Sequence, residues 1–395
     1  MPATQALSPL DAVNEFRNNN NGQVVLVLQG GGALGAYQGG VYQAMHEAGV
    51  EPDWLIGTSI GAINASIIAG NRVEDRLAKL QEFWRRVQRN GAWGAFPAWK
   101  GIADSLASWT TLTTGIPGFF ETNPRAFLGG QVPLGVDHAG FYSTEPLRKT
   151  LEELVDFSLV NQDHPRLTVG AAHLRTSMMH YFDSKEMELA PDHVMASGAL
   201  PPGFPPIEID GEHYWDGGLV SNTPLDYVLD QERDRDLLIF QIDLFPSRGP
   251  LPTTLLEAAE REKDIRYSSR TRMNTDANMK LHNTRKAIRA FLKRLPAEYQ
   301  ADPAVQKLCD DAKENTVSVV HLIYRTKNFE SSSKDYDFSR AGMIEHWKGG
   351  ERDVHHSMRH PEWLERPQNG ETMVTYDLTR DELDATGQPT KAIHE

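Results

Sequence analysis

The N-terminal part of the chain alternates short apolar runs with stretches of helical spacing. Val24–Leu28 is a continuous run of aliphatic residues, which is typical of a buried strand. Apolar residues then recur at helical spacing over 33–48, and Gly49 stands where that helix is expected to end. The pattern repeats with a short strand at Trp54–Ile56 and an apolar helix at Ala62–Ala69. Two successive strand–turn–helix units predict a parallel sheet with right-handed crossovers.

The same patterns predict further elements downstream. Helices are expected at 76–87, 144–154, 191–200 and 225–229, and strands at 167–172, 178–183, 237–244 and 317–324. Asp210-Gly211 lies between two short strand-like runs and predicts a β-hairpin. Residues 1–22, which end near four consecutive asparagines, are expected to form a flexible arm. At 395 residues, the chain has room for one large α/β domain with additions or for two domains.

Residues 90–140 interrupt this regular pattern and are interpreted as an irregular insertion over the sheet. Aromatic residues fall there among glycines, prolines and threonines without a sustained period: Trp93, Phe96, Trp99, Trp109, Phe119 and Phe120. Two roles fit such a segment. Its aromatic side chains can pack onto the core, or they can form a lid or an acyl-chain pocket.

Net charge and cysteine content limit the function classes. The formal net charge of −14 argues against nucleic acid as the main partner. Cys309 is the only cysteine, so no intramolecular disulfide can form and an oxidising compartment is not required. The N-terminus has no apolar signal region, and no stretch approaches the length of a transmembrane helix. A cytoplasmic location is therefore expected.

One segment reverses the charge of the chain. Residues 261–294 hold eleven Lys and Arg against three acids. Helical spacing is followed at its end by Ile288, Phe291, Leu292 and the adjoining Leu295. A basic amphipathic helix is typical of peripheral membrane contact. A helix that packs on an acidic protein with its charges in solvent explains the same pattern.

The turn after the first strand is built from glycine. Gly30, Gly31 and Gly32 remove every side chain from it, and Gly30-x-Gly32-x-x-Gly35 matches the dinucleotide-binding fingerprint. Asp53 lies near the spacing at which that fingerprint expects a ribose-binding acid. A tight turn that lets helix and strand pack closely accounts for the same glycines.

The turn after the second strand, Gly57-Thr58-Ser59-Ile60-Gly61, matches the nucleophile elbow G-x-S-x-G. Such a turn raises a serine hydroxyl above the sheet, and glycine on both sides relieves the crowding. The backbone N–H groups at the start of the next helix favour a developing oxyanion. Ser59 is therefore a candidate nucleophile.

A serine hydroxyl needs a base that takes its proton. His282, His321 and His346 follow in the chain, but no tight turn flanks them, and each is interpreted first as structural or surface. Asp216 opens a Gly217-Gly218 turn that leaves its carboxylate uncrowded. A carboxylate in a partly desolvated cleft can act as the base, although simple capping of the turn explains the same residues.

Three blocks in this order resemble the patatin-like phospholipase family: Gly30–Gly35, Gly57–Gly61 and Asp216–Gly218. Ala196–Pro201 and Phe204–Pro206 resemble a fourth block of that family. The resemblance implies a three-layer α/β/α catalytic domain with a mainly parallel sheet at 23–250. It also implies a mostly helical C-terminal extension at 251–395, similar to that of a bacterial subgroup.

The resemblance implies a Ser–Asp dyad without histidine. Ser59 would attack an ester carbonyl and form an acyl-enzyme, and Asp216 would be the base. The oxyanion hole would come from backbone N–H groups of Gly31, Gly32 and Ile60. The turns would be supported by Gly30, Gly35, Gly57, Gly61, Gly217 and Gly218. No cofactor or metal is expected.

The leading hypothesis is a lipid acyl-ester hydrolase of the phospholipase A, lysophospholipase or acylglycerol lipase type. Leu34 departs from the family, since many members carry Arg or Lys at that position, and this favours a less charged substrate such as a neutral glyceride. The alternatives are a nucleotide-binding oxidoreductase that uses Gly30–Gly35 and a non-catalytic lipid-binding protein. The sequence leaves acyl length, head group and oligomeric state open.

Overall fold

A computed structural model gives the structure of the chain. It describes residues 8–88, 115–128, 131–162, 165–231, 235–247, 249–268, 271–312, 315–325, 334–359 and 373–377. In parts of some helices within these ranges, only the backbone is described.

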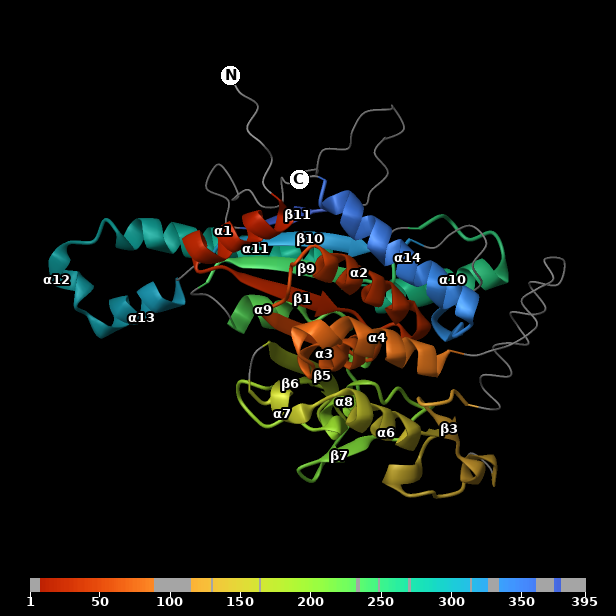
Figure 1. Cartoon of the computed structure of the whole chain (residues 1–395). Coiled ribbons are helices and arrows are strands. Elements are labelled where there is room, and N and C mark those ends of the chain that lie inside the picture. The colour runs from red at the N-terminus through yellow and green to blue at the C-terminus, as the bar shows by residue number, and fades with distance from the viewer. Residues whose placement is uncertain are drawn as a thin grey trace.

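A mixed sheet of nine strands forms the centre of the described chain (Figure 1). The strand order is β11-β10-β9-β1-β2-β5-β8-β7, and β6 also pairs with β5. Neighbours from β11 to β5 run parallel, whereas β6, β7 and β8 pair antiparallel. The strands of this sheet are β1 (Gln23–Leu28), β2 (Trp54–Thr58), β5 (Arg166–His173), β6 (Met179–Asp183), β7 (Ile207–Ile209), β8 (Glu212–Asp216), β9 (Leu237–Asp243), β10 (Val317–Ile323) and β11 (Met373–Tyr376). A separate antiparallel pair is formed by β3 (Glu121–Thr122) and β4 (Tyr142–Ser143).

Helices connect most of these strands. The α-helices are α1 (Pro9–Asn20), α2 (Ala36–Glu47), α3 (Ile60–Ala69), α4 (Val73–Val87), α6 (Glu145–Leu154), α7 (Phe157–Val160), α8 (Pro191–Ser197), α9 (Leu225–Gln231), α10 (Leu255–Tyr267), α11 (Thr271–Leu292), α12 (Ala297–Gln300), α13 (Pro303–Asp311) and α14 (Arg340–Ser357). The 3₁₀ turns are η1 (Gly32–Gly35), η4 (Pro124–Leu128), η5 (Val136–His138), η6 (Gly217–Leu219) and η7 (Lys334–Tyr336).

The sheet separates two hydrophobic cores because successive side chains of a strand point to opposite faces. On β1, Val24 and Leu26 join the larger core, which includes residues of α2, α3, α4 and α14. Val25 and Val27 join the smaller core, which includes residues of α9. The expected three-layer α/β/α fold with a mainly parallel sheet is therefore confirmed.

The N-terminal arm expected from the sequence is wrong for its described part. Residues 9–20 form α1, which the side chain of Ser8 caps by accepting a hydrogen bond from the N–H of Asp11. Val13 is fully buried in the larger core. Arg17 binds Asp53 across 3.0 Å, at the start of β2. The segment is ordered because its helix buries an apolar residue and pairs a charge.

The C-terminal region completes the central sheet. β10 pairs in parallel with β9, and β11 pairs in parallel with β10. α14 packs on α2 through glycine, since a Cβ on Gly40 would lie only 1.8 Å from the carbonyl oxygen of Trp347. Strands from both sides of the expected boundary near residue 250 therefore belong to one continuous sheet. The region is mostly helical, as expected, and α11, α12 and α13 extend past the sheet to one side (Figure 1).

The aromatic insertion and the basic amphipathic segment are described only in part. Trp93, Phe96, Trp99 and Trp109 lie outside the described residues. Phe120 is 8% exposed in the larger core, and Phe119 packs beside Phe204 and Phe338. In α11, Leu292 is 7% exposed whereas Phe291 is 62% exposed. Of the helices the structure describes, none combines the length and apolar character needed to cross a bilayer.

Candidate active site

Ser59 occupies a sharp turn between β2 and α3. Its backbone has φ 55° and ψ −125°, which is rare for a residue with a side chain. A Cβ on Gly57 would lie 2.4 Å from the carbonyl of Gly61, and a Cβ on Gly61 would lie 2.2 Å from the carbonyl oxygen of Leu28. Both positions therefore require glycine, as the nucleophile-elbow pattern implies.

Asp216 ends β8 beside this turn. β2, β5 and β8 are neighbours, with Thr58 paired to Gly170 and Ala171 paired to Asp216. This register brings Asp216 level with Ser59, and the interaction with the Ser59 side chain lowers the pKa of the Asp216 carboxyl. The sequence could not place these two residues together, because the contact depends on the pairing of three strands.

The Asp216 carboxyl has a pKa closer to neutral pH than an exposed carboxyl has. It is 3% exposed, and burial raises its pKa to about 6 even though hydrogen bonds from Ser59 and from the N–H of Gly218 lower it. The Gly218 N–H donates to Oδ1 across 2.7 Å, so the Gly217-Gly218 turn orients the carboxylate. A carboxylate with this pKa is ionised at neutral pH and is a stronger proton acceptor than an exposed one.

Ser197 supports the strained turn from α8. The backbone N–H of Ser59 donates to Ser197 Oγ at 3.0 Å, and Ser197 Oγ donates to the carbonyl oxygen of Gly170 at 2.6 Å. Ser197 is fully buried. The sequence marked Ser197 only as part of the fourth family-like block and assigned it no role.

The glycine loop lies directly against Ser59. A Cβ on Gly30 would lie 3.0 Å from Ser59 Cβ and 2.5 Å from Asn222 Oδ1. Gly30 N–H donates to the Asn222 carbonyl at 3.3 Å, and Asn222 Nδ2 donates back to the Gly30 carbonyl at 3.1 Å. Gly32 has φ 56°, which favours glycine. Among the described residues, no acceptor takes the N–H of Gly31, Gly32 or Ile60.

The geometry agrees with the comparison with known families. A family model described as patatin-like phospholipase matches residues 26–229, more than half of the chain. The chain belongs to the patatin-like phospholipase family. A second model, described as patatin phospholipase, matches residues 265–370 in the C-terminal region.

Individual relatives of this patatin-like chain are distant. An uncharacterised NTE family protein of Mycobacterium tuberculosis is 28% identical over 231 residues, which cover 57% of this chain and 31% of that protein. This chain thus spans about a third of that relative's length. A triacylglycerol lipase of Schizosaccharomyces pombe is 35% identical over 82 residues, covering 20% of this chain and 17% of the lipase. The solved structure of VipD from Legionella pneumophila aligns over 91% of this chain and 72% of that chain, at 15% identity and a TM-score of 0.38.

In this patatin-like site, a buried polar network behind the glycine loop was missed at the sequence level. Gln38 Nε2 donates to the carbonyl of Gln29 at 2.7 Å, and Asn64 Nδ2 donates to Gln38 Oε1 at 2.8 Å and to the carbonyl of Gly35 at 3.0 Å. Trp84 Nε1 completes the network by donating to Asn64 Oδ1 at 3.1 Å. The only signal in the sequence was polar residues in otherwise apolar helical stretches.

The C-terminal region of the patatin-like chain reaches the glycine loop. A Cβ on Gly32 would lie 2.3 Å from the backbone carbonyl oxygen of Asp335 in η7. Lys263 of α10 binds Asp335 at 2.8 Å and so ties α10 to this turn. The backbone carbonyl of Tyr267, at the end of α10, accepts hydrogen bonds from Gln29 and Asn222.

The dinucleotide interpretation does not fit a patatin-like site, and the geometry contradicts it. Asp53 precedes β2, where it binds Arg17 and accepts a hydrogen bond from the N–H of Val24 at 2.8 Å. This is the N-terminal end of β1 and β2, whereas the glycine loop follows their C-terminal end. Asp53 therefore lies at the wrong end of the sheet to bind a ribose beside Gly30–Gly35.

The candidate histidines of the sequence lie elsewhere. His321 pairs with Asp243, and His346 is 3% exposed and packs edge-on against Tyr324. The side chain of His282 lies outside the described residues. Within the described chain, no histidine contact with Ser59 is present.

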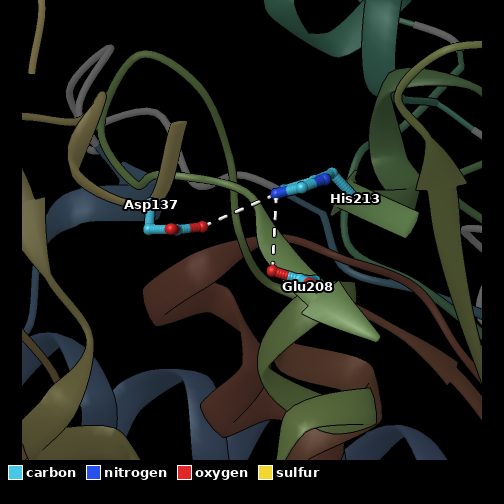
Figure 2. A group of neighbouring side chains, drawn as sticks. All are labelled: Asp137, Glu208 and His213. Carbon is cyan, nitrogen blue, oxygen red and sulfur yellow. Dashed lines mark ion pairs between the residues drawn. The ribbon is translucent and has the colours of Figure 1, made fainter. Parts of the chain in front are cut away.

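One group of side chains has the composition of a metal site (Figure 2). Figure 2 shows His213 of β8 directed at Asp137 of η5 and at its cross-strand neighbour Glu208 of β7. His213 Nε2 lies 3.5 Å from Asp137 Oδ1 and 4.0 Å from Glu208 Oε2. The side chains of Asp137 and Glu208 are 67% and 54% exposed. Exposed acidic groups of this kind are common without an ion, and we assign no metal to them.

Proposed function

We propose that this protein is a lipid acyl-ester hydrolase in which Ser59 is the nucleophile and Asp216 the base. The strand register that brings the Ser59 elbow level with the buried Asp216 carboxylate carries this proposal. The strained elbow and the glycine loop against it support the assignment. Family membership supports a lipid as the substrate class.

The proposed reaction proceeds in two halves. Asp216 takes the hydroxyl proton while Ser59 Oγ attacks the ester carbonyl, and the resulting oxyanion accepts hydrogen bonds from Gly31, Gly32 and Ile60 N–H groups. Asp216 then returns the proton to the leaving alcohol, and the acyl group stays on Ser59. Asp216 next takes a proton from water, which attacks the acyl-enzyme and releases the fatty acid. The final proton transfer from Asp216 restores the Ser59 hydroxyl.

A neutral glyceride or a similar uncharged acyl ester is the proposed substrate. Leu34 is fully buried, so the loop position that carries Arg or Lys in many family members offers no charge here. The similarity of one segment to a triacylglycerol lipase supports the same substrate class.

Peripheral membrane contact is proposed through the start of α10. Leu251, Leu255 and Leu256 are 90%, 91% and 70% exposed, an apolar cluster of a kind that commonly marks an interaction surface. The other end of α10 binds Gln29 and Asn222 beside the glycine loop. Contact of these leucines with a lipid surface would bring substrate to the end of the sheet that carries Ser59.

Turnover of p-nitrophenyl esters with a short and a long acyl chain tests the proposal. We expect hydrolysis by the parent protein and loss of at least about a thousandfold in Ser59→Ala and in Asp216→Asn. Retained turnover in Asp216→Asn would assign the base to another residue. Liposome binding without turnover in the parent protein would instead support the non-catalytic lipid-binding alternative.

A further inference from the structure

A buried histidine–carboxylate pair lies on the face of the sheet that α9 covers. Asp243 and His321 follow the alternation of Ile239 and Val319, which belong to the smaller core. His321 Nε2 lies 2.6 Å from Asp243 Oδ2. Asp243 is 1% exposed, and the side chain of His321 is 13% exposed. The proposed reaction does not use either group.

The pair connects to the catalytic end of the sheet through Thr223. Asp243 Oδ1 accepts a hydrogen bond from Thr223 Oγ1 at 3.4 Å and from Gln241 Nε2 at 3.0 Å. Thr223 Oγ1 in turn accepts from Gln29 Nε2 at 2.8 Å. Because a hydroxyl has one proton, its donation to Asp243 leaves its lone pairs free to accept from Gln29.

Gln29 fixes the backbone on both sides of the glycine loop. It is fully buried and immediately precedes Gly30. Its Oε1 accepts from the N–H of Leu244 at 2.5 Å and from the N–H of Phe245 at 3.0 Å. Leu244 closes one side of the loop, since a Cβ on Gly31 would lie 2.7 Å from Leu244 Cδ1. A movement of the Gln29 amide would therefore displace Gly31 in two ways, through the adjoining backbone and through Leu244.

We propose that His321 is a positioning residue for the oxyanion loop, acting through Asp243, Thr223 and Gln29. The proposal rests on the proposed function and deepens it. His321 lies outside the patatin-like match at 26–229 and inside the C-terminal match at 265–370. The C-terminal region thereby contributes to the geometry of a site whose reacting groups lie in the N-terminal region.

The protonation state of His321 governs this connection. Burial lowers the pKa of His321, but the carboxylates of Asp243 and Asp377 raise it, and its net pKa lies above the ordinary histidine value despite the opposing charge of Arg325. These charged groups lie near His321 on three sides, Asp243 in β9, Asp377 after β11 and Arg325 after β10. A raised folded-state pKa means that the ion pair is intact at low pH and is lost as the pH rises through that value. Loop positioning should therefore decline on the alkaline side.

The test measures p-nitrophenyl ester turnover as a function of pH in His321→Gln and in the parent protein. The spontaneous hydrolysis of the ester is subtracted at each pH. We expect kcat to fall about tenfold or more at neutral pH, with a smaller change in KM, and the alkaline decline of the parent profile to disappear. His346→Gln is the matched control, since His346 is also a buried histidine and packs edge-on against Tyr324. It should retain the parent profile.

Thr223→Val keeps the proposal testable if His321→Gln does not fold. The valine removes the hydroxyl that links Asp243 to Gln29 but leaves the His321–Asp243 pair in place. We expect reduced kcat and no alkaline decline, while the NMR titration of the His321 ring is retained. If both variants keep the parent pH profile and turnover still requires Ser59, the inference about His321 is overturned and the proposed function stands. Turnover that survives Ser59→Ala would instead overturn the proposed function.

Discussion

The backbone N–H of Ser59 donates a hydrogen bond to the side chain of Ser197, and the Ser197 hydroxyl donates one to the carbonyl of Gly170. This arrangement ties a residue of unusual backbone conformation to a buried strand. The support comes from α8, far from the elbow in sequence.

Ser197→Ala should therefore impair turnover by loosening the elbow. The alanine leaves two buried backbone groups without their partner, which costs about 1–3 kcal/mol of stability. We expect kcat to fall about tenfold, with KM little changed, because the position of Ser59 Oγ is affected more than substrate binding. Steady-state kinetics and thermal unfolding measure the two effects.

Ser66→Ala is the control for this prediction. Ser66 is fully buried in α3, and its hydroxyl donates to the carbonyl of Ile63 in the same helix. It should lose stability without losing kcat. Equal loss of kcat in both variants would show that Ser197 acts through general stability.

The acid limb of the pH profile should report Asp216. The base must be ionised, and burial raises the pKa of Asp216 to about 6, so kcat/KM should fall as the pH drops through about 6. An exposed carboxyl would place this limb near pH 4. A limb at that lower pH would show that the carboxylate is well solvated in solution.

The buried charge of Asp216 should also lower the free energy of unfolding at neutral pH. Its folded-state pKa lies above the unfolded value, so the folded protein binds this proton more tightly and stability falls as the pH rises from about 4 to about 6. Asp216→Asn removes the buried charge and should raise the unfolding free energy at pH 7 by on the order of 2–3 kcal/mol while turnover is lost. Chemical denaturation at pH 4 and pH 7 tests this, because the gain should be much smaller at pH 4.

Gly32→Ala should displace the oxyanion loop. The new Cβ would lie 2.3 Å from the Asp335 carbonyl oxygen, and the residue would also keep φ 56°. Gly135→Ala is a matched control, since Gly135 has φ 83° but no atom within 4 Å of its Cβ position. Both variants should lose about 1 kcal/mol of stability from backbone strain, but only Gly32→Ala should lose turnover.

Leu255→Ser with Leu256→Ser should weaken liposome binding. The two side chains are 91% and 70% exposed, so the substitutions remove apolar surface without opening the core. Co-sedimentation with neutral vesicles should show at least a tenfold weaker association. A second variant, in which Arg285, Arg289 and Lys293 are neutralised, tests the basic helix in the same assay. If only that variant loses binding, the contact lies on α11 or its end.

The local elements were largely predictable because their signals are local. The strand at 24–28 became Gln23–Leu28, and the helix expected at 62–69 became Ile60–Ala69. The Asp210-Gly211 hairpin is present, with positive φ at both residues. The expected flexible arm is wrong over Pro9–Asn20, because α1 is held by distant groups through Arg17 and the buried Val13.

The residues of the candidate site also differ in whether a local sequence signal marks them. Short motifs gave Ser59, Asp216 and the glycine loop, because a sharp turn needs glycine at fixed positions. Ser197, Gln29 and His321 carry no such local signal. Their proposed roles follow from hydrogen bonds to residues far away in the chain.

The sequence by itself determined the alternation of strands and helices and the glycine turns, because periodicity and turn chemistry act between near neighbours. Only the tertiary structure decided that β10 lies beside β9, that Asp216 stands level with Ser59, and that Asp53 faces Arg17 instead of a ligand. Strand order and register depend on pairing between segments distant in the chain, and no local pattern specifies them.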